Sequence, residues 1–120
     1  MHTFQSVSDY AIRREQEEQA TLQAPARTML LEEAIKITSK DRNDAYGNPE
    51  DNFSNIASYW NSYCQQRFRV ALDITPQDVA HFMILMKLAR LATNAGHRDS
   101  LVDIAGYAAC AEDCRASSKT

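Results

Sequence analysis

Hydrophobic residues recur at helical spacing along most of this 120-residue chain, and the alternation that marks β-strands is nearly absent. This periodicity is the strongest constraint on the fold, because it lets the chain bury apolar surface only along helix faces. We therefore predict an all-α protein of about five helices with short connections and no internal repeat.

Local signals place the ends of these helices. The clearest start is at Thr75-Pro76-Gln77-Asp78, where a threonine cap, a first-turn proline and an acidic residue coincide. The helix that follows is apolar nearly all round, which favours either the centre of a bundle or a subunit interface. His81 on this helix is expected to be a core histidine. The predicted helices cover residues 7–23, 27–43, from near 51 to about 67, 76–93 and 98–116.

A change in composition at Ala24-Pro25 divides the chain. Residues 1–25 are rich in charged and amide side chains, so they predict an exposed helix or arm that either docks on a partner subunit or frays. Residues 26–116 hold the apolar stripes and form the predicted all-α domain. Residues 117–120 are expected to be a disordered tail.

Composition excludes several classes of protein. The chain is 44% hydrophobic with a net charge of -3, which argues against disorder and against a strongly basic nucleic-acid surface. The longest apolar run, residues 79–91, is interrupted by charged side chains and is too short to span a bilayer. The first residues lack the apolar core of a secretory signal. We expect a cytoplasmic protein that binds neither membrane nor nucleic acid.

The cysteines fit the same compartment. Cys64, Cys110 and Cys114 make an odd number, which suits no disulfide framework. Cys110 and Cys114 lie one helical turn apart, but no nearby residues complete a zinc site. They are predicted to be small buried residues.

Two pairs of charged residues stand out in the last two predicted helices. Asp99 and Asp103 are four residues apart, so their carboxylates share one helix face and can share a divalent cation. Lys87 and Arg90 form a matching cationic pair on the preceding helix. Two interpretations stay open: a site for phosphate and metal, or a buried ion-pair network.

A polar turn, DRNDAYGNPEDNF, covers residues 41–53. Gly47 and Asn48-Pro49 account for the turn itself. Arg42, Tyr46 and Asn52 are the candidates to stack on and hydrogen-bond a base or ribose.

The blocks AYGNPEDNF, TPQDVAHFMILMKLARL and HRDSLVDIAGYAAC occur in this order within residues 30–111. Together they resemble a family of small phage and prophage proteins defined by a domain of unknown function. More distantly, the chain resembles the MazG-like all-α nucleoside triphosphate pyrophosphohydrolases. That resemblance implies a helical bundle, a homo-oligomer and Mg²⁺ ligands on the segment DSLVDIAGY, where Asp99, Asp103 and Tyr107 fall on the pattern.

The chain also departs from the MazG-like pattern. Those enzymes bring a second acidic pair from an earlier helix, and the counterpart here, LLEEAIKIT, offers Glu32 and Glu33. One turn later stand Ile35, Lys36 and Ile37, so the acidic set is incomplete. Metal-assisted hydrolysis needs several carboxylates, so this loss weakens hydrolysis more than nucleotide binding.

The first hypothesis is therefore a phage-type nucleotide-binding protein that acts as a Mg²⁺-dependent pyrophosphohydrolase. The alternative is a non-enzymatic counter-defence protein, which sequesters a nucleotide signal or inhibits a host or defence protein in the host cytoplasm. A third, structural interpretation treats the charged cluster as an ion-pair lock. Under the first hypothesis, Asp99, Asp103 and Glu33 hold the metal, Lys87 and Arg90 neutralise phosphates, and Arg42, Tyr46 and Asn52 contact the nucleoside.

Overall fold

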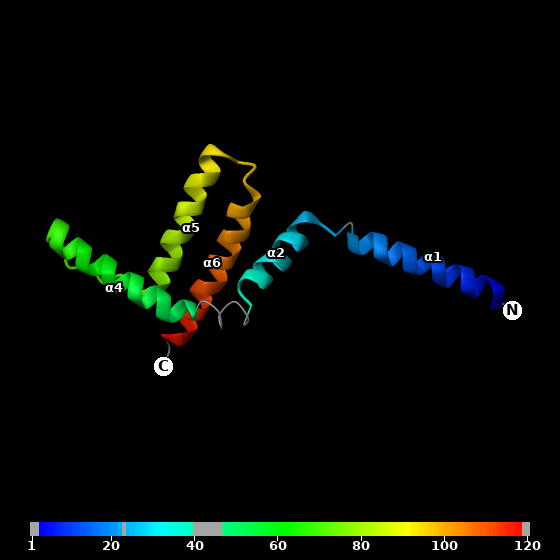
Figure 1. The fold of residues 1–120 in the computed structure, drawn as a ribbon, viewed down its shortest axis with the longest axis horizontal. Helices are drawn as coiled ribbons and strands as arrows, with labels where there is room; N and C mark the ends of the chain where they lie inside the picture. Colours follow the sequence, from blue (N-terminus) through cyan, green and yellow to red (C-terminus); the bar gives the residue numbers. More distant parts are fainter. Residues whose placement is uncertain (1–2, 23, 40–46, 119–120) are drawn as a thin grey trace.

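The structure is a computed structural model that describes residues 3–22, 24–39 and 47–118. Over these residues it contains five α-helices and no β-strand (Figure 1). The predicted all-α fold class is therefore confirmed. The helices are α1 (Thr3–Leu22), α2 (Ala26–Ile37), α4 (Pro49–Phe68), α5 (Pro76–Thr93) and α6 (Arg98–Ser117).

α6 is the helix on which the others pack, because α2, α4 and α5 all contact it. Figure 1 shows α5 and α6 side by side, joined by a short turn. Several of the buried residues of α6 are small, among them Ser100, Gly106 and Ala111. Small side chains let neighbouring helices approach from more than one direction. The apolar content of residues 76–93 left α5 two roles, the centre of a bundle or a subunit interface, and within one chain α6 takes the central place.

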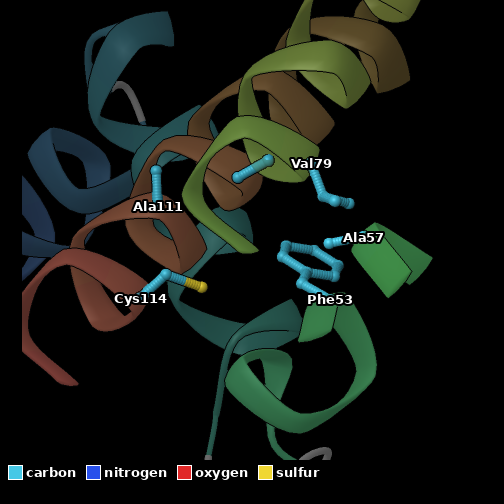
Figure 2. Packing of buried hydrophobic residues seen from close by; sticks show 6 residues of the cluster. Phe53, Ala57, Val79, Ala111 and Cys114 are labelled. Carbon is cyan, nitrogen blue, oxygen red and sulfur yellow. The ribbon is translucent and has the colours of Figure 1, made fainter. Parts of the chain in front are cut away.

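The hydrophobic core lies where α4, α5 and α6 meet. Phe53 is the only large side chain among its buried members, and Figure 2 shows its ring extending from α4 toward α5, with the sulfur of Cys114 on α6 turned toward it. Trp60 and Tyr107 pack against this cluster from its edge. Cys114 is buried and Cys110 is half-buried, which confirms their assignment as packed residues. The buried members are Phe53, Ala57, Val79, Ala80, Ala111 and Cys114.

Local hydrogen bonds fix how α5 begins. The Thr75 side chain accepts from the backbone N–H of Asp78, and the Asp78 carboxylate accepts from the N–H of Thr75, so the predicted start is a complete capping box. Asn61 on α4 binds the backbone of Ile74 twice, donating to its carbonyl at 3.0 Å and accepting from its N–H at 2.8 Å. One side chain thus fastens the connection before α5 to α4.

Other helix ends differ from the prediction. α2 ends at Ile37, although the pattern predicted a helix to residue 43. Thr38 caps α2 by donating its hydroxyl to the carbonyl of Ala34 at 2.8 Å, and polar residues that bond to nearby backbone in this way favour helix ends over helix interiors. α4 begins at Pro49, two residues before the expected Asp51. α5 matches the predicted range of 76–93.

α1 extends away from the other helices, and it gives the molecule its long dimension of 82 Å (Figure 1). Its side chains are exposed from residue 7 to residue 17, as the polar composition predicted. The accessible surface of the chain is 9258 Å², whereas a compact monomer of this mass has about 6,600 Å². The chain is therefore much more open than a compact domain. No described helix combines the length and hydropathy that a bilayer-spanning segment needs.

Several apolar side chains of α5 are also exposed, including Phe82, Leu85 and Met86. His81 on the same helix is exposed as well, so its prediction as a core histidine is wrong. The reason is that periodicity identifies an apolar face but does not say whether the same chain covers it.

Candidate functional site

The candidate site is a pocket of about 230 Å³ between the end of α2, the start of α4 and the middle of α6. Its wall combines aromatic, amide, hydroxyl and carboxylate groups, which is the mixture that small-molecule sites use for packing and orientation. The lining residues are Ile37, Thr38, Gly47, Pro49, Asn52, Phe53, Asp103, Gly106, Tyr107, Cys110 and Asp113.

α6 supplies one wall of this pocket from a single face. Its lining residues follow one another at intervals of one or three residues, so they line the same side of the helix: Asp103, Gly106, Tyr107, Cys110 and Asp113. The end of α2 lies close to Gly106: a Cβ added there would lie 2.9 Å from the Ile37 terminal methyl. The absence of a side chain at Gly106 therefore lets α2 close over this wall.

The first turn of α4 supplies the opposite wall. Gly47 adopts φ 88°, a left-handed conformation that suits glycine, and Pro49 begins the helix two residues later. This geometry sets Asn52 and Phe53 in the first turns of α4. The ring of Phe53 lies 6.4 Å from that of Tyr107, measured between centroids, so an aromatic pair joins the α4 and α6 walls.

Asp103 is a charged residue in the pocket lining that forms an ion pair across two helices. Its carboxylate forms an ion pair with the Lys87 ammonium of α5, with Oδ2 and Nζ 3.0 Å apart. The Lys87 side chain is 18% exposed and that of Asp103 is 36% exposed, so water only partly screens the pair. Of the two predicted cations on α5, Lys87 is the one that reaches the pocket wall.

Burial also affects the thiol in the pocket wall. It raises the pKa of Cys110 above its ordinary value, and the negative charges of Asp113 and Glu50 add to the effect. Burial raises the pKa of Cys114, one turn further on, to about 11. Both thiols therefore stay protonated at neutral pH, and neither is suited to act as a nucleophile.

Glu33 lies elsewhere on the molecule. Its carboxylate accepts a hydrogen bond from the Arg98 guanidinium, which ties α2 to the start of α6. Both residues line a second hollow of about 430 Å³ along α2, together with Glu32 and Lys36. That hollow shares no lining residue with the pocket at Asp103. The resemblance implied that Glu33 acts together with Asp103, and the structure pairs each of them with a different cation.

The remaining predicted residues fall in several places. Asn52 lines the pocket. Arg90 and Asp99 are exposed, on α5 and in the first turn of α6 respectively. Arg42 and Tyr46 lie outside the described residues.

The donor set tests whether the implied Mg²⁺ fits. Within residues 3–22, 24–39 and 47–118, no group of three or more His, Cys, Asp or Glu side chains is arranged to hold a metal ion. Asp103 and Glu33 each already bind a cationic side chain. The described residues therefore do not form the expected three-carboxylate set of Glu33, Asp99 and Asp103.

Some lining residues were missed by the sequence reasoning. Thr38, Gly106 and Asp113 were not singled out as site residues, although Gly106 and Asp113 continue the spacing that starts at Asp103. Extending the acidic pattern along the helix by threes and fours would have found both. Thr38 gave no comparable signal, because it joins the site only through the packing of α2 on α6.

These features define a small protein that is helical over its described residues and has a mixed polar and aromatic pocket on its central helix. A family described as "Domain of unknown function (DUF6378)" matches residues 29–115, which is more than half of the chain, so the chain belongs to this family. The match includes every lining residue of the pocket.

Two curated relatives come from bacteriophages. The Gene 55 protein of Mycobacterium phage D29 is 43% identical over 83 residues, covering 69% of this chain and 51% of the relative. The Gene 55 protein of Mycobacterium phage L5 is 40% identical over 83 residues, with 69% and 50% covered. The chain spans about half the length of these relatives. No solved structure matches it significantly. The predicted membership of a phage protein family of unknown function is confirmed.

Proposed function

We propose that this chain binds a nucleotide-derived small molecule in the pocket between α2, α4 and α6, and sequesters it without hydrolysis. The observation that carries the proposal is the lining of the pocket, which combines Tyr107 and Asn52 with two carboxylates, Asp103 and Asp113. The volume of about 230 Å³ lies just below the roughly 300–1,000 Å³ of drug-sized sites. It suits a base with part of its sugar.

The polar groups favour a ligand that donates hydrogen bonds. Ionised carboxylates only accept, so Asp103 and Asp113 suit the amino and ring N–H groups of a nucleobase better than a phosphate. The phosphates of the ligand would lie at the rim of the pocket and bind cationic side chains of α5. These are Lys87, which pairs with Asp103, and Arg90, three residues further along the helix. Arg42 and Tyr46 stay proposed nucleoside contacts.

Binding without hydrolysis is favoured over Mg²⁺-dependent hydrolysis because two of the candidate metal-binding carboxylates already form ion pairs. Lys87 engages Asp103, and Arg98 engages Glu33. Water activation on a phosphoryl group needs carboxylates that are available to metal ions. Sequestration of a nucleotide signal in the host cytoplasm is a counter-defence activity, and membership of a phage family supports this role. We also propose a relation to the MazG-like proteins, which the all-helical fold of the described residues supports, and, separately, a homo-oligomer.

The test is a thermal-shift and calorimetric screen of the full chain against nucleoside mono-, di- and triphosphates, cyclic nucleotides and ADP-ribose, with and without Mg²⁺. A ligand that binds the folded state raises the melting temperature by mass action. We expect a shift that does not depend on Mg²⁺ and an intact ligand afterwards. No shift with any of these compounds would overturn the proposal, and release of pyrophosphate would replace sequestration with hydrolysis.

Two matched variants on α6 separate the hypotheses. Asp113 is exposed and lines the pocket, whereas Asp99 is exposed and does not line it. Asp113→Asn should weaken binding by about tenfold, the loss expected for a hydrogen bond to a charged group. Asp99→Asn should bind as the wild type does. The opposite pattern, with Mg²⁺-dependent activity lost in Asp99→Asn, would support the metal site.

A further inference from the structure

α4 and α5 expose large apolar side chains on a surface that is separate from the pocket. Six of them define what we term the α4–α5 face, and their exposure reaches 74% at Tyr59. None of the six is charged. They are Tyr59, Tyr63, Phe68, Phe82, Leu85 and Met86.

Helical spacing and ring contacts make these side chains one surface. Tyr59 and Tyr63 are one turn apart on α4, and Leu85 and Met86 follow Phe82 by one turn on α5. Trp60, beside Tyr59, lies with its ring centroid 5.5 Å from that of Phe82, which links the two helices. Tyr63 contacts Phe68 edge to face at 6.3 Å, which extends the surface to the end of α4.

The size of the α4–α5 face exceeds what a monomer usually exposes. At roughly 200 Å² for each fully exposed large residue, the exposed fractions amount to about 700 Å². The largest apolar patch on a typical monomer is roughly 300–600 Å². In contrast, half of the buried hydrophobic residues in the described part of the chain are alanines. Among the described residues, many large apolar side chains are therefore exposed rather than packed in the core.

We propose that a second copy of this chain covers the α4–α5 face and forms a symmetric dimer. Covering the face in both copies removes about 1,400 Å² from water, within the roughly 1,200–2,000 Å² of a standard stable interface. A two-fold interface brings each surface against itself. The uncharged character of the six residues permits this without like-charge repulsion, and Arg67 stays at the edge, over the Phe68 ring.

Trp60 provides a direct test because it is the only tryptophan of the chain and contacts the face through Phe82. The mass of the full chain is measured by sedimentation over an about thousandfold dilution, since dissociation depends on concentration. The fluorescence emission of Trp60 is recorded at the same concentrations. We expect twice the 13.6 kDa of one chain at high concentration and a red shift of emission as the dimer dissociates. A monomer at every concentration would overturn the proposal. An emission that does not change as a dimer dissociates would also overturn it.

A pair of leucine variants locates the interface. Leu85 on α5 is 57% exposed and Leu31 on α2 is 56% exposed. The two leucines are therefore equally accessible to water, but only Leu85 belongs to the α4–α5 face. Leu85→Glu should weaken the dimer by about a hundredfold, as removal of a central interface anchor does. Leu31→Glu should dimerise as the wild type does. A Leu85→Glu dimer as tight as the wild type would contradict this face, and the dilution of the wild type decides the question if the variant loses its helices.

This proposal does not depend on the ligand. The pocket is lined by α2, α6 and the start of α4, and it shares no residue with the α4–α5 face. Failure of nucleotide binding therefore leaves the dimer untouched, and a monomer would leave the pocket in place.

Discussion

The ion pair between Lys87 and Asp103 is the interaction in which sequence and structure agree best at the level of single residues. The spacing of charges on residues 87–103 predicted a cationic partner for Asp103, and the structure provides one 3.0 Å away. The sequence did not determine the partner of Glu33, because Arg98 lies 65 residues further along the chain. Pairs between distant segments depend on helix packing, and no local pattern encodes that.

Removal of the Asp103 charge should reduce stability measurably. Asp103→Asn leaves the mostly buried Lys87 ammonium without its ion partner, and we expect the free energy of unfolding to fall by about 1 kcal/mol. Urea unfolding followed by circular dichroism measures this change. Glu33→Gln is the matched control, because its pair with Arg98 also joins two helices but is about half exposed. Equal losses in the two variants would contradict the role of burial.

The buried thiol of Cys114 gives the protein a pH dependence in the alkaline range. Burial raises its pKa from 9.0 to about 11. Between these values the unfolded chain releases the thiol proton while the folded chain keeps it, so ionisation favours unfolding and stability falls as pH rises. Denaturation at pH 8, 9 and 10 measures the slope. Cys114→Ala should show a shallower slope, and an unchanged slope would refute this assignment.

At the level of helices, the prediction succeeded where the determining interactions are local. The start of α5 was predicted at the correct residue, because Thr75 and Asp78 form a capping box within four residues. The end of α2 was missed, because residues 38–43 contain no glycine or proline that would mark a helix end. Thr38 ends the helix by a hydrogen bond back to the Ala34 carbonyl. The same holds for the pocket. The spacing of residues along α6 is visible in the sequence and predicts that wall, whereas no local pattern predicts the wall formed by α2.

Gly106 controls the distance between α2 and α6. A valine there would place its branched side chain against Ile37 and Thr38, where even a Cβ lies 2.9 Å from a methyl of Ile37. We expect Gly106→Val to lower the free energy of unfolding by about 1–3 kcal/mol and to weaken ligand binding, because Gly106 also lines the pocket. Thermal unfolding and calorimetry measure the two effects.

The control for this variant is Ala109→Val, which places the same side chain on an exposed position of α6. Its helix propensity cost is up to about 0.7 kcal/mol, whereas Gly106→Val has no such cost because glycine is a poorer helix former than valine. Ala109→Val should retain ligand binding and lose little stability. If Gly106→Val loses no more stability and no more ligand binding than Ala109→Val, contact with α2 does not determine the result.

At the scale of the molecule, the sequence predicted the five helices that the described residues form, but not which of them is central. Periodicity reports that a face is apolar, and α5 has the more apolar sequence. α6 takes the central place because its buried residues are small, including Gly106 and Ala111. The sequence also left two roles for residues 76–93 open, and the exposed Leu85 and Met86 support an interface on that helix.

The contacts of α2 also affect the order in which the helices assemble during folding. Asn61 and Ile74 are only 13 residues apart, whereas the link from Glu33 to Arg98 closes a segment of 65 residues. Longer segments close at a higher entropic cost, so α4, α5 and α6 should assemble first and α2 should join last. Pulse-labelled hydrogen exchange during refolding should then show α2 amides protected after those of α5, and simultaneous protection would contradict this order. The pocket, which needs α2, would be the last part of the molecule to form.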